Sequence, residues 1–208
     1  MPLVLSLARS PLVESSRFFG KGLQASASSG QVLVNGEVAP VFFANGSQVN
    51  AEIPYDVPTD KPVSLSLTSA GTSSNTVQLS MQPAAPGIFT STGNRAVVEN
   101  ADYSINSPSN PAHLGDFVTV YLTGGGAVSP AVATGVPTPS TPLSRVNAPN
   151  SVSIGGTAAL VYFLGLTPRF EGLYQANVQV PTLGRNRLMP VTESTQPRDP
   201  VAASRRHR

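Results

Sequence analysis

The stretch VLVNGEVAPVFF, residues 32–43, has a near copy in VSIGGTAALVYF, residues 152–163. In both stretches apolar and polar residues alternate around a dipeptide, Asn35-Gly36 or Gly155-Gly156, that tolerates positive φ. This pattern predicts a β-hairpin with a two-residue turn in each copy. Corresponding positions lie 120 residues apart: Val32, Val34, Gly36, Ala39, Val41 and Phe43 match Val152, Ile154, Gly156, Ala159, Val161 and Phe163.

A second pair of phrases follows the two hairpins. QVNAEIP at 48–54 is repeated as QANVQVP at 175–181, now with an offset of 127 residues. A longer loop at GLTPRFEGLY, residues 165–174, accounts for the extra seven residues. Two phrases in the same order indicate an internal duplication. The repeated Gln and Asn are expected to bond to the backbone where each strand begins.

Other segments read as short strands. PVSLSLTSAG at 62–71 and NTVQLSMQ at 75–82 predict the closing hairpin of the first copy, and RAVVEN at 95–100 and DFVTVYLTG at 116–124 predict strands that precede the second hairpin. No segment has a convincing helical period. Short alternating strands at this spacing favour two antiparallel sandwiches of the immunoglobulin type.

The segment 116–124 alternates throughout. Phe117, Thr119 and Tyr121 should face one side of a sheet and Val118, Val120 and Leu122 the other, and both faces are expected to be buried or nearly so. The next segment, 123–149, contains five prolines and cannot pair as a strand through most of its length. We expect an ordered, extended strap that covers the edge of the second sandwich.

Composition agrees with this fold and excludes some functions. The 208 residues include 20 prolines and 18 glycines and only 12% charged residues. Residues 31–181 carry four basic and eight acidic side chains, so the formal charge of +2 arises at the chain ends. A folded nucleic-acid interface would need clustered Lys or Arg on the domain itself, and is therefore disfavoured. The tail, residues 182–208, holds six arginines and is expected to be basic and disordered.

The chain contains no cysteine, which excludes disulfides, thiolate metal sites and cysteine nucleophiles. The apolar start PLVLSLA has no basic residues before it and makes a poor signal peptide. No run approaches the length of a membrane span.

These observations predict an all-β fold of two tandem immunoglobulin-like antiparallel β-sandwich repeats, either of which could be incomplete, with a disordered C-terminal tail. The expected division is a divergent lead segment at 1–30, a first sandwich at 31–88, a second sandwich at 89–181 and the tail at 182–208.

Several phrases together resemble one known family. VLVNG, QVNAEIPY, AAPGIFT, NSPSNPA, TGGGAVSP, PLSR and YQANVQVP, between Val32 and Pro181, look like the uncharacterised Solibacter-type C-terminal domain family of acidobacterial proteins. The resemblance implies a pair of β-sandwiches at the end of a large exported protein, outside the cytoplasm, and transfers no active-site residue. The chain departs from the family pattern after Pro181, where an alternating strand pair is expected, and over its first thirty residues.

Candidate catalytic and metal-binding residues each have a simpler structural interpretation. His113 and Asp116 could join a serine in a catalytic triad, but a G-x-S-x-G elbow is missing and a lone loop histidine is usually solvated. The loop residues Glu99, Asn100, Asp102 and Asn106 offer oxygen ligands for calcium without the EF-hand spacing, and Asn and Asp commonly stabilise turns. We therefore expect no catalytic residue, no metal site and no cofactor.

The remaining motifs are ambiguous. Gly124-Gly125-Gly126 lacks the Lys of a phosphate loop and favours backbone bending. Asn45-Gly46-Ser47 matches a glycosylation acceptor and also a turn. Aromatic residues could form a sugar-stacking surface or belong to the core, and Tyr103 and Tyr162 are the candidates for glycan contact. The wider aromatic set is Tyr55, Tyr103, Tyr162, Phe170 and Tyr174.

The function expected from the sequence is a non-catalytic structural or protein-interaction module of an exported or cell-surface bacterial protein. Its partners would be other protein domains or envelope components. The alternative is a carbohydrate-binding module that anchors a secreted protein to polysaccharide. A hydrolase that depends on His113 is the third hypothesis, and we do not expect it.

Overall fold

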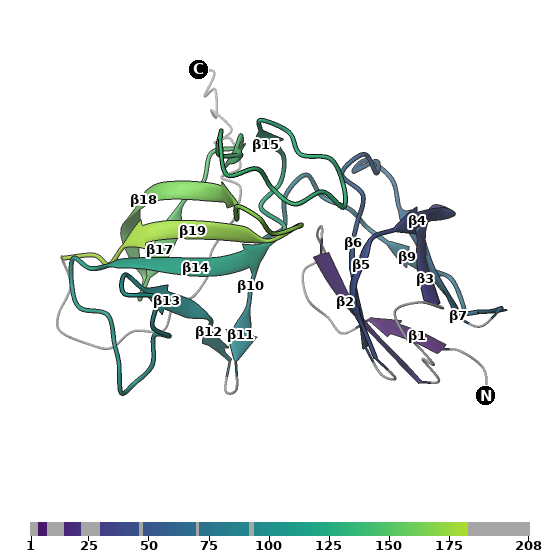
Figure 1. The fold of residues 1–208 in the computed structure, drawn as a ribbon, viewed down its shortest axis with the longest axis horizontal. Helices are drawn as coiled ribbons and strands as arrows, with labels where there is room; N and C mark the ends of the chain where they lie inside the picture. Colours follow the sequence, from purple (N-terminus) through teal and green to yellow (C-terminus); the bar gives the residue numbers. More distant parts are fainter. Residues whose placement is uncertain are drawn as a thin grey trace, which may run out of the picture.

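The computed structural model describes residues 4–7, 15–21, 30–45, 48–69, 71–91 and 94–182. The described residues form β-strands and connecting loops, with no helix among them. All strand pairs are antiparallel, so the predicted all-β class is confirmed. Figure 1 shows two groups of strands side by side, which we call the first and second lobes. In the described part of the chain, no helix is available to cross a membrane.

The first lobe contains two sheets. One has the order β1 (Val4–Leu7), β2 (Ser15–Lys21), β6 (Gln48–Glu52), β5 (Val41–Ala44). The other has the order β4 (Glu37–Ala39), β3 (Gly30–Val34), β7 (Val63–Ser69), β8 (Thr72–Ser73), and β9 (Val77–Leu79) also pairs with β7. β1 and β2 lie within the segment that the sequence predicted as a divergent lead.

The two sheets of the first lobe share one core. In β7, the alternate residues from Val63 to Ser69 are buried, as the alternating sequence VSLSLTS predicts. Their aliphatic side chains meet those of β3 and β6, so burial of apolar surface holds the sheets together. The buried members of this cluster are Val32, Val34, Ala39, Val49, Ala51, Ile53, Val63, Leu65, Leu67, Leu79 and Met81.

The second lobe is built on one larger sheet. Its order is β10 (Gly87–Ile88), β14 (Phe117–Thr123), β19 (Tyr174–Gln179), β18 (Thr157–Leu166), β16 (Arg145–Val146), β15 (Val128–Ser129). β13 (Val98–Asn100) also pairs with β14, and β17 (Val152–Ile154) with β18. β11 (Thr90–Ser91) and β12 (Arg95–Ala96) form a separate pair.

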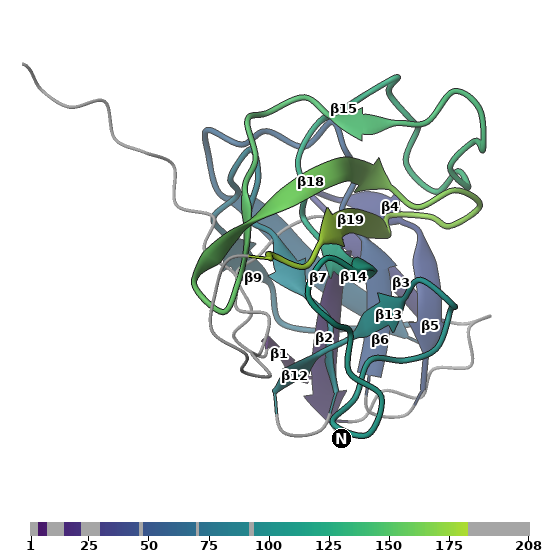
Figure 2. The ribbon, with the colours of Figure 1, turned by 90° about the vertical axis from the view of Figure 1, so that its left-hand side faces the viewer.

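The sheet of the second lobe has its own core on one face. Figure 2 shows that β18 is a long, curved strand of this sheet. Val118, Val120 and Leu122 of β14 are buried there with residues of β19 and β18. The buried members of this second cluster are Val98, Val118, Val120, Leu122, Leu166, Tyr174, Ala176 and Val178.

Strand pairing is the same in the two repeated segments. β3 pairs with β4 through Val32↔Ala39 and Val34↔Glu37, and β17 pairs with β18 through the positions 120 residues later. Both turns have positive φ at both residues, 52° and 88° in Asn35-Gly36 and 59° and 79° in Gly155-Gly156. The predicted two-residue hairpins are therefore confirmed.

The similarity continues past the hairpins. β5 pairs with β6 through Val41↔Ala51 and Phe43↔Asn50, and β18 pairs with β19 through Val161↔Val178 and Phe163↔Asn177. Each pair has a register shift at the same place, between the matched Val and Phe. Residues that the sequence matched at offsets of 120 and 127 therefore have equivalent cross-strand neighbours in the two copies.

The two segments differ in burial. Val32 and Val34 are each 1% exposed, whereas Val152 and Ile154 are only half-buried. β3 pairs with both β4 and β7, but β17 pairs only with β18 among the described strands. The predicted disordered tail, apart from Thr182, lies outside the described residues.

The predicted strap between β14 and β17 is ordered. It contains only the two short strands β15 and β16, and backbone bonds join Thr138 N to Phe170 O at 3.0 Å and Arg169 N to Thr138 O at 2.7 Å. It also contacts the first lobe, where Tyr55 N donates to Thr134 Oγ1 at 3.0 Å and Gly135 N to Glu52 Oε2 at 2.5 Å. The strap therefore joins the two lobes, which the sequence did not predict.

Candidate functional site

The face of the β14–β19–β18 sheet that points away from the core is partly exposed. Along β14 the side chains alternate, with Val118 4% exposed and Phe117 45% exposed. Thr119 and Tyr121 lie on the same side as Phe117 and are half-buried. The expectation that both faces of this strand are buried or nearly so is wrong at Phe117. On neighbouring β18 the same face is covered in part, because Arg145 lies over Phe163, which is opposite Asn177.

Cross-strand neighbours extend this exposed face over three strands. Gln179 of β19 lies opposite both Phe117 and Leu160. Asn177 lies opposite Thr119, and Gln175 lies opposite Tyr121. We call this surface the outer strip, and define it by Phe117, Thr119, Tyr121, Leu160, Tyr162, Gln175, Asn177 and Gln179.

One end of the outer strip is aromatic. The rings of Phe117 and Tyr162 lie edge to face, with centroids 4.9 Å apart and planes at 70°. Tyr162 falls within the register shift of β18 and is 51% exposed, and Leu160 beside it is 59% exposed. Arg145 lies over the ring of Phe163 at 4.9 Å and donates from Nη1 to Tyr162 O at 3.2 Å, which holds this part of β18 in place.

The middle of the outer strip consists of amide groups. Gln175 Nε2 and Thr119 Oγ1 both donate to Asn177 Oδ1, at 3.0 and 3.3 Å, and Gln179 Nε2 donates to Gly115 O at 2.9 Å. Within the described part of the chain, the Asn177 amide nitrogen and the Gln175 and Gln179 amide oxygens have no hydrogen-bond partner. These groups are positioned by their neighbours and retain capacity to bond a ligand.

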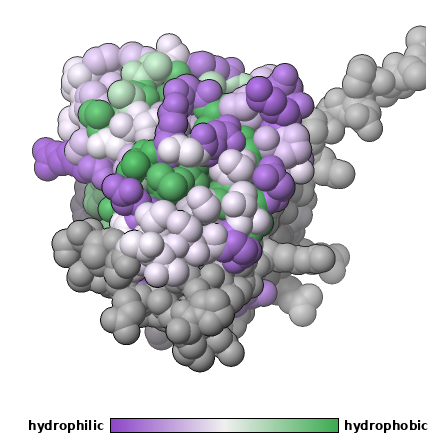
Figure 3. Space-filling view, turned by 90° about the vertical axis from the view of Figure 1, so that its right-hand side faces the viewer, coloured by the Kyte–Doolittle hydropathy of each residue, from purple (hydrophilic) through white to green (hydrophobic). Residues whose placement is uncertain are grey.

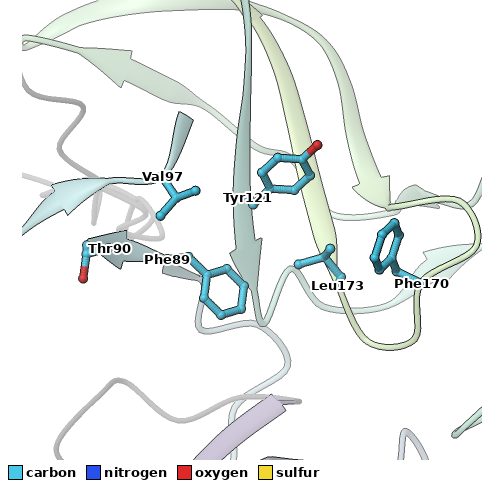
Figure 4. Close-up of a pocket in the computed structure, with 6 residues that line it drawn as sticks. All are labelled: Phe89, Thr90, Val97, Tyr121, Phe170 and Leu173. Atoms are coloured by element: carbon cyan, nitrogen blue, oxygen red, sulfur yellow. The ribbon is translucent and has the colours of Figure 1, made fainter. Parts of the chain in front are cut away.

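The other end of the outer strip opens into an apolar hollow of about 370 Å³. Phe89 follows β10 and lies next to Tyr121, since Phe89 N donates to Tyr121 O at 3.1 Å. Figure 4 shows the rings of Phe89, Tyr121 and Phe170 around Leu173. The full lining is Phe89, Thr90, Val97, Tyr121, Phe170 and Leu173.

Tyr121 and Thr90 are the residues with polar side chains that line this hollow. Partial burial, followed by the nearby Glu99 carboxylate, raises the pKa of the Tyr121 phenol above its ordinary value.

The two predicted glycan-contacting residues are separated by the fold. Tyr162 belongs to the outer strip, whereas Tyr103 lies in the loop between β13 and β14, is 83% exposed and has a φ of 65°. Phe117, Leu160 and Gln179 were not predicted from the sequence as members of this surface. The alternating pattern F-x-T-x-Y in β14 would have predicted Phe117 on this surface if the second face of the strand had been expected to be exposed.

The wider aromatic set divides between core and surface. Tyr174 is fully buried and donates from its hydroxyl to Gly126 O at 2.7 Å, so it is a core residue. A side chain at Gly125 would overlap the Tyr174 ring. Phe170 is 56% exposed and lines the hollow, and Tyr55 is half-buried near the strap.

His113 and Asp116 form a turn at the surface. His113 Nδ1 lies 3.3 Å from Asp116 Oδ2, and the same carboxylate accepts a bond from His113 N at 2.7 Å. The histidine side chain is 83% exposed. This contact stabilises the start of β14, where Gly115 N also bonds to Val180 O at 2.9 Å.

The predicted calcium loop bonds to itself. Asp102 Oδ1 accepts from both the backbone and the hydroxyl of Ser104, which lowers the pKa of Asp102. Asn106 Nδ2 donates to Asn100 Oδ1 at 3.0 Å. In the described residues, no three His, Cys, Asp or Glu side chains gather in a metal-binding arrangement.

Three smaller predictions are also resolved. Gln48 Nε2 bonds to Asn50 Oδ1 at 2.6 Å, as Gln175 does to Asn177, so the expected side-chain-to-backbone role is wrong and the repeated feature is a side-chain pair. Gly124 and Gly126 have φ of 71° and 84°, which confirms backbone bending. Asn45 Oδ1 caps a turn by accepting from Gln48 N at 2.8 Å, while Gly46 and Ser47 lie outside the described residues.

Comparisons of this chain with protein-family models, with curated proteins and with solved structures found no match. The resemblance to the Solibacter-type C-terminal domain family therefore stays a prediction.

Proposed function

We propose that this chain is a non-catalytic interaction module of a larger exported or cell-surface bacterial protein, and that its lobes are tandem immunoglobulin-like units. The observation that carries the proposal is the outer strip, a set of exposed aromatic and half-buried amide side chains on a hydrogen-bonded sheet. A sheet holds side chains at fixed spacing, so such a surface suits binding without chemistry.

The repeated architecture supports the modular part of the proposal. The two segments share their hairpin turns, their register and the position of the register shift. Two copies of one unit explain this agreement, because each shared feature would otherwise have to arise independently. The exported location is supported by the resemblance of the sequence phrases.

The interpretation of His113 supports the non-catalytic part. Its imidazole is exposed and contacts the carboxylate that closes its own turn, 3.3 Å away. A general base needs a nucleophile within hydrogen-bond reach and an oriented ring. The hydrolase hypothesis has no such geometry to support it at this residue.

Two measurements test this proposal. Protease added to intact cells that express the native gene should degrade the protein, as detected with an antibody against this chain. Protection until lysis would refute the exported location. The purified chain should show no hydrolysis of ester, glycoside or peptide substrates, and an activity that disappears in His113→Ala would refute the non-catalytic assignment.

A further inference from the structure

We propose that the outer strip and the adjoining hollow form one binding site for an uncharged polysaccharide chain. The inference deepens the proposed function, on which it rests, by naming the class of partner. It follows from the position of the aromatic groups, from the unused amide groups between them and from the charge of the surface.

The position of the aromatic groups suits a linear ligand. Phe117 and Tyr162 lie at one end of the strip, and Tyr121 lies at the other end beside Phe89 and Phe170. Phe117 and Tyr121 are four residues apart on β14, which corresponds to about 14 Å along the strand. An extended polymer can lie along β14 and β19 with a ring against each end, whereas a compact ligand reaches only one.

The chemistry between the ends matches hydroxyl groups. The Asn177 amide nitrogen donates, and the Gln175 and Gln179 amide oxygens accept, so the row offers both kinds of partner. A sugar hydroxyl is also both donor and acceptor. The apolar C–H face of a pyranose ring complements the aromatic side chains on either side of this row.

The charge of the surface favours an uncharged ligand. The outer strip contains no carboxylate, ammonium or guanidinium group. Two charged side chains border it: Glu99 lies opposite Thr119 in the β13–β14 pair, and the guanidinium of Arg145 lies over Phe163, which is opposite Asn177. One carboxylate and one guanidinium therefore flank the strip on its two long sides. An anionic or cationic polymer along the strip would therefore be attracted by one of these groups and repelled by the other.

The first lobe provides a matched control within the same chain. Phe42 occupies the position equivalent to Tyr162, 120 residues earlier, and is 39% exposed. The glutamine position of the strip, Gln179, is taken there by Glu52, which is buried beneath the strap. Figure 3 views the molecule from the side of the first lobe and shows hydrophobic side chains bordered by hydrophilic ones. The equivalent surface of the first lobe is thus partly used for contact between lobes.

The experiment is affinity electrophoresis of the full chain in native gels that contain xyloglucan, galactomannan, arabinoxylan or hydroxyethylcellulose. Migration should be slowed in at least one gel relative to a non-binding reference protein. Calorimetry with that polymer should show an association constant about tenfold lower for Phe117→Ala and for Tyr162→Ala. Changing sodium chloride from 50 to 500 mM should alter it by less than about twofold.

Control variants separate the site from other exposed rings. Phe42→Ala and Tyr103→Asn should bind as the unmodified chain does, the latter because asparagine tolerates the positive φ at this position. Circular dichroism melting should be unchanged in every variant, since all four rings are exposed.

Three results would overturn the inference. The first is that no gel slows the migration of the chain. The second is that migration is still slowed for a Phe117→Ala/Tyr162→Ala double variant. The third is that the outer strip binds a labelled proline-rich peptide and no polysaccharide. New reducing ends in the polymer would instead refute the non-catalytic function. If there is neither binding nor cleavage, the polysaccharide inference alone fails.

Discussion

Glu52 and Gln179 occupy equivalent places in the two copies but have different surroundings. Gln179 lies on the open outer strip, whereas Glu52 is 1% exposed beneath the strap and accepts the Gly135 N–H. Burial raises the pKa of the Glu52 carboxyl, against the opposing effect of bonds from Gly135 and Tyr55, and the Glu171 carboxylate raises it further. The second copy shows that a neutral amide fits this position in the strand.

Glu52→Gln should therefore change how stability depends on pH. The pKa of Glu52 is higher in the folded chain than in the unfolded one. The contribution of Glu52 to the free energy of unfolding is therefore fully present below about pH 4.5, and is lost as pH rises through the pKa of the folded chain. As pH rises through the pKa of Glu52 in the folded chain, Glu52→Gln should become more stable relative to the unmodified chain. Urea unfolding at a series of pH values measures it.

The control for this prediction is Glu37→Gln, which changes an exposed carboxylate on β4. It should leave the pH profile close to that of the unmodified chain. Glu52→Ala should be about 1–3 kcal/mol less stable than Glu52→Gln at every pH, because both variants lack the titrating carboxyl but only alanine leaves the Gly135 N–H without an acceptor. Equal pH profiles for Glu52→Gln and the unmodified chain would contradict the assignment.

Single residues could be predicted from the sequence only in part. Tyr162 was named as a candidate for glycan contact because aromatic faces suit sugar rings, and its side chain is 51% exposed. Phe117 was expected to be nearly buried, because an apolar side chain carries no local signal of whether a second layer covers it. Nothing in the segment around Gln179 predicted its place in the outer strip. That place follows from its pairing with Phe117 on β14 and Leu160 on β18.

At the level of elements, the clearest difference between the copies is a proline. β4 and β5 are separate strands on either side of Pro40, whereas β18 runs without a break through the equivalent residue, Leu160. Proline cannot donate to a ladder, and in the first copy only the Pro40 carbonyl is used, by Glu52 N at 2.9 Å. The chain there leaves one sheet and joins the other.

Leu160→Pro should test whether the continuous strand matters. The substitution removes the amide that faces Gln179 and should lower the unfolding free energy by about 1–3 kcal/mol. Leu160→Ala removes an exposed side chain but keeps the amide, and should change stability by less than about 0.5 kcal/mol. Urea unfolding of both variants distinguishes the two effects, and equal losses would refute the role given to the backbone.

The sequence predicted the hairpins and the inserted loop well because turn chemistry and offsets are local. Asn35-Gly36 and Gly155-Gly156 permit positive φ, and the structure has it at all four residues. The register shift within β18 and within the β5–β6 pair was not predicted. No single residue type specifies such a bulge, in which two residues of one strand lie opposite one residue of its partner.

Across the whole molecule, the strap determines how the lobes meet. Thr134 and Gly135 come from the second lobe and contact Tyr55 and Glu52 of the first. These partners are about eighty residues apart in the chain. The sequence contains no pattern that connects them, so an ordered strap could be predicted while its attachment to the other lobe could not.

Gly135→Ala should loosen this attachment. A Cβ at this residue would lie 2.9 Å from Pro40 Cγ, and the φ of 71° is unfavourable for alanine. Gly71→Ala is the matched control, because it has a φ of 75° and no atom within 4 Å of the added carbon. Small-angle scattering should give a larger radius of gyration for Gly135→Ala alone, and an unchanged radius would show that the strap does not hold the lobes together.

The equal registers of the two copies also expose a newly synthesised chain to a specific error. A hairpin from one copy has the length, turn and alternation to pair in the other copy's place, which is a known route to misassembly in tandem repeats. The differences at equivalent positions act against this exchange. A misplaced Glu52 would be buried without the Gly135 amide, and a misplaced Pro40 would interrupt the long strand, so divergence between the copies raises the free energy of the swapped state.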